Sequence, residues 1–450
     1  MLQKLQKNPQ DSHRKITNLR FQSDAGFLWA LAGLLSGSQA EPRRSGILHK
    51  NPSGLSCRFC QIIGLGILHQ SAKIAKILEK VSWMKILQLG KFYPPHLGGI
   101  ETVMQDICDG MNKRGILCDC LVSNKSLAYQ ENITPYGGRI FRTASLGILA
   151  STSITPQMIF KLREIIKNYD IIHLHYPDPI AVLALLLTPS DKIILTHYHS
   201  DIFKNRFYFG PFAPLQKAIL KRSDLIITTS QKYINESPYL RDFAQKCIAI
   251  PIGVDMPKSD IDTSKNQNII CSVGRLVPIK GFESLIASAQ FLPEDFEIHI
   301  AGGGDERYKA KLQNLIQSLQ LEHRVFLVGP KKKEELLEFY AKSKYFVLPS
   351  LQESYGIVLV EALSFGLPCV STKLKPSGSD FINQHQSTGL VIEPKDPKAI
   401  AKAILEIEKN YDFYSSNAKK RYLENFQLQT MIHAFEATYQ KQYAKRSQTC

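Results

Sequence analysis

The sequence predicts an α/β protein with two Rossmann-like domains that face each other across a cleft. From Met84 onward, short apolar runs alternate with amphipathic helical patterns, which is typical of parallel sheets covered by helices. This series stops at a polar segment with little to bury, residues 253–267, and a second series with a similar rhythm follows it. A length of 450 residues also suits two or three domains.

The predicted strands are short apolar runs that are followed by helical periodicity, so they should pair in parallel. In such sheets ligands gather at the carboxyl ends of the strands, and the loops there are expected to carry the function. In the first series the expected strands are Lys85–Leu89, Leu117–Val122, Asp170–His173, Lys192–Thr196 and Asp224–Thr228. In the second they are Asn268–Val273, Glu297–Ala301, Arg324–Val328, Tyr345–Leu348, Cys369–Ser371 and Gly389–Ile392.

Residues 1–83 differ from the rest because they show no sustained strand or helix period, apart from one short amphipathic stretch. A strand pattern begins directly after Met84, so we expect Met84 to be the natural start and the extension to lie outside the fold. A signal peptide, with residues 25–35 as its apolar stretch, is the weaker alternative. The other expected parts are an N-terminal domain over 84–252, a linker over 253–267, a C-terminal domain over 268–426 and a closing helix over 427–450.

The chain is basic, with a formal net charge of +16. Residues 1–83 hold 12 Lys/Arg and 4 Asp/Glu, so half of the excess lies in the first fifth of the chain. A basic surface suits either simple solubility or a weak attraction to an anionic membrane. No stretch interleaves aromatic residues with Arg or Lys as a nucleic-acid platform does, so no nucleic-acid partner is expected.

Cysteine usage and hydropathy indicate the compartment. Nine cysteines are an odd number without regular spacing, which predicts neither a disulfide framework nor a zinc site. The sequence contains no run of 18 apolar residues that would predict a membrane span. We therefore expect a cytoplasmic protein that is either free or held peripherally at the inner face of the cell membrane.

The segment after the expected strand 345–348 is the most informative one. A helix should begin near Tyr355, and Gly356 would let a ligand come close to its first turn. The free backbone N–H groups around Ser354 and Ile357, together with the helix dipole, favour an anion such as a diphosphate. This segment is therefore the first candidate site.

Charged residues accompany this turn. Glu353 and Glu361 are carboxylates that suit pairs of sugar hydroxyls, although each is also an ordinary residue for a helix surface. Arg275 and Lys280 follow the first strand of the second series, where two cations could stabilise a diphosphate without a metal. Gly303 lies in a glycine run at another strand end, which permits close backbone approach; this run is not GxGxxG, so a dinucleotide cofactor is disfavoured.

In the first series, Gly99 opens a helix after the first strand, where a phosphate or a sugar could approach. Two histidine pairs, His173 with His175 and His197 with His199, follow neighbouring strands, and we expect one member of each pair to face the core. Four histidines at adjacent strand ends indicate a cleft. A metal cluster is the weaker interpretation because no carboxylates are placed as ligands, and the sequence predicts no metal.

Taken together, these motifs resemble the large family four of retaining glycosyltransferases, which have the GT-B fold. The resemblance covers Met84 to about residue 444 and rests on the GGIE turn (98–101), the GRL…KG segment (274–281), the FLVGP run (326–330) and the Glu353-x7-Glu361 pair, in matching order. It implies that the donor is a hexose linked to GDP or UDP and that the acceptor is a glycan or a lipid-linked molecule. It also implies that the enzyme needs no cofactor and no metal. The anomeric configuration would be retained because the acceptor attacks the sugar on the same face from which the phosphate departs.

The resemblance also implies roles for the candidate residues. Glu353 would contact hydroxyls of the donor sugar and Glu361 those of the ribose. Arg275 and Lys280 would hold the diphosphate with the amides of 354–357. The remaining implied contacts are Gly99 on the phosphate side, Val328 and Gly329 near the base, and His175 on the acceptor side.

Two departures leave the donor open. Tyr355 stands where phenylalanine is frequent, and residues 375–379 replace a glycine pair or Gly-Thr-Gly. The stretch 196–202 looks like members that build bacterial surface polysaccharides, including lipopolysaccharide. The alternatives are a sugar-nucleotide 2-epimerase on the same fold, for which the histidine pairs could supply acid and base, and a catalytically silent GT-B subunit that regulates a partner.

Overall fold

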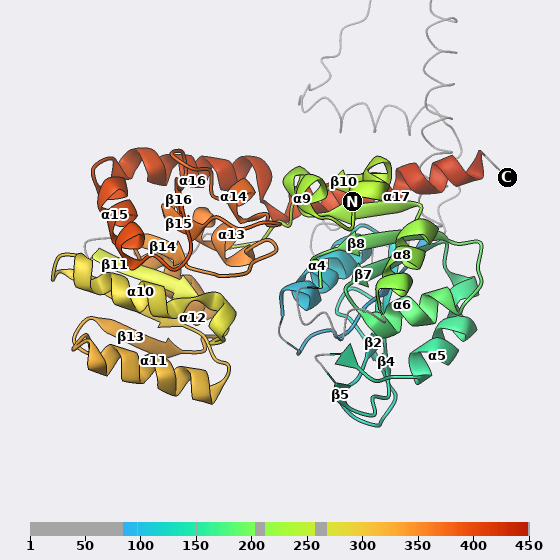
Figure 1. The fold of residues 1–450 in the computed structure, drawn as a ribbon. Helices are drawn as coiled ribbons and strands as arrows, with labels where there is room; N and C mark the ends of the chain where they lie inside the picture. The colour runs from blue at the N-terminus through green and yellow to red at the C-terminus, as the bar shows by residue number, and fades with distance from the viewer. Residues whose placement is uncertain (1–83, 97, 150–151, 203–211, 257–267, 449–450) are drawn as a thin grey trace, which may run out of the picture. The chain divides into compact units, whose positions relative to one another are not determined.

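The computed structural model describes residues 84–96, 98–149, 152–202, 212–256 and 268–448 (Figure 1). The predicted extension over 1–83 and residues 257–267 of the predicted linker lie outside the described residues. Within the described ranges, no helix combines the length and the apolar character that a membrane span requires.

The N-terminal half forms an eight-stranded sheet in the order β10-β9-β8-β7-β1-β2-β4-β3. Only β3 runs antiparallel, to β4. The central strands are buried on both faces, which is why their sequences are continuous apolar runs rather than alternating ones. The strands are β1 (Lys85–Leu89), β2 (Leu117–Ser123), β3 (Gln130–Ile133), β4 (Arg139–Thr143), β7 (Ile171–Tyr176), β8 (Ile193–Tyr198), β9 (Leu225–Thr228) and β10 (Cys247–Ala249), with a separate hairpin of β5 (Ile148–Leu149) and β6 (Thr152–Ser153).

The C-terminal half forms a six-stranded parallel sheet in the order β13-β12-β11-β14-β15-β16. In chain order this is 3-2-1-4-5-6, the arrangement of a doubly wound dinucleotide-type domain. Its strands are β11 (Asn268–Val273), β12 (Phe296–Ala301), β13 (Val325–Gly329), β14 (Tyr345–Leu348), β15 (Cys369–Thr372) and β16 (Gly389–Ile392).

Helices follow most of the strands, as the alternating pattern predicts. The helices of the first half are α4 (Gly99–Lys113), α5 (Gln157–Ile165), α6 (Pro179–Leu186), α8 (Ala213–Arg222) and α9 (Gln231–Glu236). Those of the second half are α10 (Phe282–Ser288), α11 (Glu306–Ser318), α12 (Lys333–Lys342), α13 (Ile357–Ser364), α14 (Ser379–Ile382), α15 (Pro397–Glu408), α16 (Tyr411–Asn425) and α17 (Leu428–Ser447).

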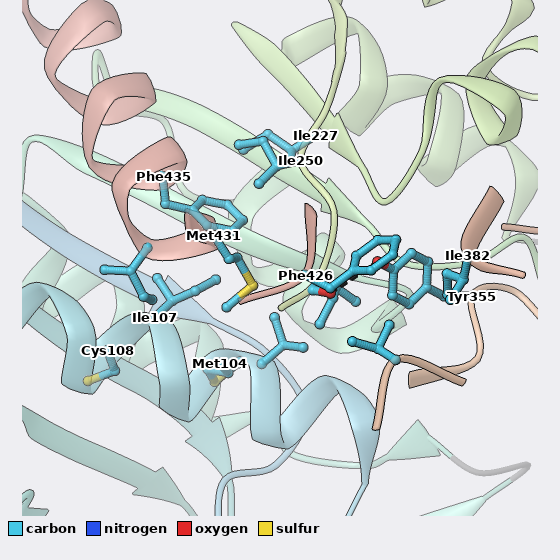
Figure 2. Close-up of a cluster of buried hydrophobic side chains, with 14 of the residues drawn as sticks. Met104, Ile107, Cys108, Ile227, Ile250, Tyr355, Ile382, Phe426, Met431 and Phe435 are labelled. Atoms are coloured by element: carbon cyan, nitrogen blue, oxygen red, sulfur yellow. Dashed lines mark hydrogen bonds between the residues drawn. The ribbon is translucent and has the colours of Figure 1, made fainter. Parts of the chain in front are cut away.

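The last helix, α17, returns to the N-terminal half. Val254 N–H donates to the Phe426 carbonyl (3.0 Å) and Leu428 N–H donates to the Val254 carbonyl (3.2 Å), so the two crossing segments are bonded to each other. Figure 2 shows Met431 and Phe435 of α17 beside Ile107 of α4, in one buried hydrophobic cluster that also includes residues of the C-terminal half. The returning helix thereby ties the two halves together.

The predicted bounds of β1, β11, β14 and β16 are confirmed. β3 was not predicted because all four of its side chains are exposed, so it carries no apolar alternation. β7 is longer than predicted and extends to Tyr176, so that both histidines of this strand lie within it rather than beyond its end.

Candidate active site

In the C-terminal sheet, β11 and β14 are neighbours although the chain visits β12 and β13 between them. Open parallel sheets bind ligands in the crevice beyond such a reversal of strand order. The loop after β11 contains Arg275 and Lys280, and the loop after β14 contains Glu353 and Gly356. The two motifs are far apart in the sequence, but the loops that contain them therefore begin at neighbouring strands on the same edge of the sheet.

The two loops are joined by an ion pair. Lys280 Nζ lies 2.6 Å from Glu353 Oε2, and each side chain is 15% exposed. Gly281 permits this approach, because it has a φ of 66° and a Cβ at this position would lie 2.3 Å from the Pro349 carbonyl oxygen. Leu351 N–H also donates to the Ile279 carbonyl (2.8 Å). The structure thus brings together a cation and a carboxylate that the sequence assigned to one site, and both remain reachable from solvent.

The glycine run after β12 packs onto the same edge. Gly302 has a φ of 156°, and a Cβ there would lie 1.8 Å from the Gly274 carbonyl oxygen. Leu276 N–H donates to the Gly303 carbonyl (2.9 Å), and Gly302 N–H donates to the Gly329 carbonyl (2.9 Å). The loops that carry Arg275, Gly303 and Gly329 are therefore held side by side.

Helix α13 begins at Ile357, with Gly356 before it in a left-handed conformation (φ 92°). The start lies two residues beyond the one expected, because Tyr355 is directed inward. Its ring is buried, and its hydroxyl donates to the Ile252 carbonyl (3.0 Å). The Ser354 carbonyl accepts from Gly378 N–H (2.7 Å). Tyr355 can therefore offer a ligand its backbone but not its side chain.

Glu361 lies in the second turn of α13 and is supported by a neighbour that sequence reasoning missed. The Tyr340 hydroxyl donates to Glu361 Oε2 (2.7 Å). Burial raises the pKa of the Glu361 carboxyl, while the Tyr340 hydroxyl and the nearby Lys333 cation act in the opposite direction. No pattern in the sequence links Tyr340 to Glu361, since they lie on different helices.

The first turn of α4 brings N-terminal residues to this region. A Cβ on Gly99 would lie 3.2 Å from Ile357 Cδ1, so the first turns of α4 and α13 are close together. Burial raises the pKa of Glu101, and the Lys91 and Arg275 cations act against this shift. Glu101 belongs to the GGIE turn but was not predicted as a site residue. The effect of Arg275 on the Glu101 pKa indicates that this carboxylate is within electrostatic range of a cation that should hold a diphosphate.

His175 forms its hydrogen bonds within the N-terminal domain and not with the loops that carry Arg275 and Glu353. It is 1% exposed, and its ring nitrogens contact Gln88 Oε1 (2.7 Å) and His199 Nε2 (3.0 Å). Burial, together with the neighbouring histidines, lowers its pKa well below the usual value, so the ring is neutral at physiological pH. Its role on the acceptor side stays a prediction.

The expectation that one histidine of each pair faces the core and the other a cleft is wrong. His173, His175, His197 and His199 are all buried, with exposed fractions of 0 to 6%. The rings of His173 and His175 stack with centroids 4.6 Å apart. The reason is the period of a strand, because side chains two residues apart point to the same face.

Two family descriptions match the chain. Residues 97–257 match the family described as Glycosyltransferase Family 4, and residues 257–424 match the one described as Glycosyl transferases group 1. The chain is 28% identical to O-antigen chain mannosyltransferase C of Escherichia coli, over 79% of this chain and 98% of that protein. It is 29% identical to D-rhamnosyltransferase WbpZ of Pseudomonas aeruginosa, over 76% of this chain and 92% of that protein.

A solved structure supports the fold. The crystal structure of Alr3699/HepE from Anabaena in complex with UDP is similar with a TM-score of 0.64 and 21% sequence identity, over 79% of this chain and 99% of that chain. Together with the two parallel sheets, this likeness confirms the GT-B fold that the sequence motifs predicted.

Proposed function

We propose a specific reaction for this chain, which belongs to the glycosyltransferases of family 4 and group 1. It transfers a hexose from a GDP- or UDP-sugar to a glycan or lipid-linked acceptor in polysaccharide biosynthesis, with retention of anomeric configuration. The names of the relatives support a hexose and a surface polysaccharide, since one is an O-antigen mannosyltransferase and the other a rhamnosyltransferase. The UDP bound to the structural neighbour supports a nucleotide donor.

The observation that carries this proposal is the Lys280–Glu353 pair, which joins the loops at the strand reversal just before the first turn of α13. When the bond between the sugar and the diphosphate breaks, the departing phosphate oxygen gains negative charge. Lys280 is already held in place by Glu353, so it can stabilise that charge without reorganisation. Arg275 and the free N–H groups of α13 would act on the same diphosphate.

Retention needs no nucleophile from the protein in this proposal. The acceptor oxygen bonds to the anomeric carbon on the face that the diphosphate leaves, and the acceptor proton passes to the departing phosphate oxygen. The neutral, buried histidines fit this scheme, because burial lowers the pKa of His173 and of His199 to about 3, so neither is an imidazolium that could act as an acid near neutral pH. The same property disfavours a histidine acid in the 2-epimerase alternative.

The other candidate residues would bind the rest of the donor. Glu361, held by Tyr340, would accept hydrogen bonds from the ribose hydroxyls. Val328 and Gly329 lie at the end of β13, where backbone groups would contact the base. Gly99 opens α4 beside the first turn of α13 and has no side chain of its own that would obstruct a phosphate or sugar there.

We also propose a weak peripheral contact with the inner face of an anionic membrane. The observation that suggests it is a group of five basic residues within 204–222, of which Lys204 and Arg206 lie outside the described residues. Arg222 donates to the Thr188 carbonyl (2.8 Å), so it is partly committed within the fold, which leaves Lys217 and Lys221 as the described candidates. Sedimentation with anionic vesicles should exceed that with neutral vesicles and fall with salt. Equal sedimentation with both would rule this contact out.

A panel of donors tests the proposed reaction. The chain would be incubated with GDP- and UDP-linked mannose, glucose, N-acetylglucosamine and rhamnose, and the products followed by mass spectrometry. We expect one donor to release its nucleoside diphosphate and to pass its sugar to an acceptor or, slowly, to water. A sugar returned on its nucleotide with inverted C2 would support the epimerase instead. No turnover of any donor would support the silent subunit.

A further inference from the structure

The four buried histidines form a cluster, and the transfer step as proposed takes no proton from any of them. β7 and β8 are neighbouring strands, and His175 is paired in register with His197. Ring centroids lie 5.5 Å apart for His173 and His197, and 5.4 Å apart for His175 and His197. One ring nitrogen from each of His173, His175 and His197 can be chosen so that all three lie within 4.8 Å of one another.

Three ring nitrogens of this cluster have no hydrogen-bond partner among the described residues. They are Nε2 of His173 and both Nδ1 and Nε2 of His197. Both side chains are 0% exposed, so bulk water cannot supply the missing partner. Buried polar atoms are nearly always satisfied in folded proteins, and a group of orphans at one point therefore indicates an occupant.

The existing hydrogen bonds leave lone pairs on the right atoms. Gln88 Nε2 donates to the Met104 carbonyl (3.1 Å), so Gln88 Oε1 faces His175 Nε2 (2.7 Å) and accepts a hydrogen bond from its N–H. His175 Nδ1 then carries a lone pair, which accepts from His199 Nε2 (3.0 Å) unless an ion takes that place. His173 Nδ1 lies 2.6 Å from the Tyr439 hydroxyl, and with the proton on Nδ1 its Nε2 is also free to bind. Histidines that bind metals are usually held in this way, with the second ring N–H given to an oxygen.

We propose that His173, His175 and His197 bind one divalent transition-metal ion, of the kind that imidazole ligands prefer, such as Zn²⁺ or Co²⁺. Three imidazoles are a known ligand set for Zn²⁺, and the absence of carboxylates within the cluster disfavours Mg²⁺ and Ca²⁺. A water molecule or an anion enclosed with the ion would complete the coordination, and binding would displace the hydrogen bond between His175 Nδ1 and His199 Nε2 (3.0 Å).

The ion would have a structural role. It would join β7 to β8 and, through the hydrogen bond from His173 to Tyr439, fix α17 against the N-terminal sheet. Metal content is measured without donor or acceptor, so the metal site and the transferase assignment stand or fall separately.

Metal content tests the proposal. The full chain without an affinity tag would be produced in minimal medium supplemented with Zn²⁺ or with Co²⁺, and its metal measured by mass spectrometry after gel filtration. We expect about one ion per chain, and for Co²⁺ the visible absorption of a four-coordinate site. A folded chain that carries no stoichiometric ion would overturn the proposal.

Variants separate this site from adventitious binding. His197→Ala and His173→Ala should each lower metal affinity by about 100-fold or more, since even outer hydrogen-bond partners of a ligand contribute 10- to 100-fold. His323→Ala is the matched control, because this side chain is 62% exposed and far from β7 in sequence. Tyr439→Phe provides a milder change that should preserve the fold while weakening binding. Metal content that is the same in all four variants would contradict the assignment.

Discussion

In the N-terminal sheet, β1 and β7 meet where the strand order reverses, and in the C-terminal sheet β11 and β14 meet at the equivalent place. The second place is lined by an ion pair whose side chains remain 15% exposed. Strand β7 at the first place carries His173 and His175, which are 0 to 1% exposed and neutral. Charges that remain reachable can stabilise a charged ligand, whereas buried neutral rings suit a role in the fold or the binding of an enclosed ion. The same topology therefore serves two different purposes in one chain.

The largest expected effect is a difference in stability between glycine substitutions in the two domains. In the C-terminal domain, Gly302→Ala places a Cβ 1.8 Å from the Gly274 carbonyl oxygen, and we expect a loss of about 4 kcal/mol or more in the free energy of unfolding. In the N-terminal domain, Gly147 has a similar φ of 142°, but among the described residues nothing beyond its chain neighbours lies within 4 Å of its would-be Cβ. Gly147→Ala should cost only about 1–2 kcal/mol, from backbone strain. Chemical denaturation measures both, and equal losses would contradict the close loop packing.

Tyr340→Phe should act on donor binding through Glu361. A hydrogen bond to a charged group contributes about 1.5–3 kcal/mol, so we expect donor KM to rise roughly tenfold with kcat little changed. Tyr411→Phe is the control, because its hydroxyl contacts the Lys344 carbonyl (3.3 Å) at the opposite end of β14. If both variants bound donor equally well, Glu361 would not be a donor contact.

The same pair predicts a pH dependence. Burial already raises the pKa of Glu361, and the Tyr340 hydroxyl lowers it. As pH falls through the raised pKa, Glu361 takes up a proton, so donor KM should rise toward acid. In Tyr340→Phe the pKa is higher still, and the rise should begin at a higher pH. A pH profile of KM that is identical in wild type and variant would count against this role.

The smallest expected effect lies at the histidines. Tyr439→Phe removes the hydroxyl that contacts His173 Nδ1, and we expect about 0.5–1.5 kcal/mol less stability with no change in kcat. Tyr443→Phe, on the same helix, is a control that should change neither quantity. A loss of turnover in Tyr439→Phe with unchanged stability would show that the N-terminal cluster takes part in the reaction after all.

The sequence predicts the fold better than it predicts the contacts within the site. Buried parallel strands are mostly apolar runs, so the first and last residues of β1 and β11 could be predicted correctly. The electrostatic interaction between Glu101 and Arg275 could not be anticipated, because these residues follow strands of different sheets. The histidine pairs were misjudged at the level of local geometry, since β7 continues through His175 and the strand period puts both rings on one face.

The central claim is that Lys280, held by Glu353 beside the start of α13, stabilises the leaving diphosphate without a metal. The most direct measurement is kcat of Lys280→Ala at saturating donor in the presence of EDTA, against wild type and against Lys342→Ala, whose side chain is 69% exposed. We predict that wild type and Lys342→Ala keep full turnover and that Lys280→Ala loses roughly 10²- to 10³-fold, the scale of one preorganised transition-state donor. Normal turnover by Lys280→Ala, or wild-type activity that EDTA abolishes and Mg²⁺ restores, would contradict it.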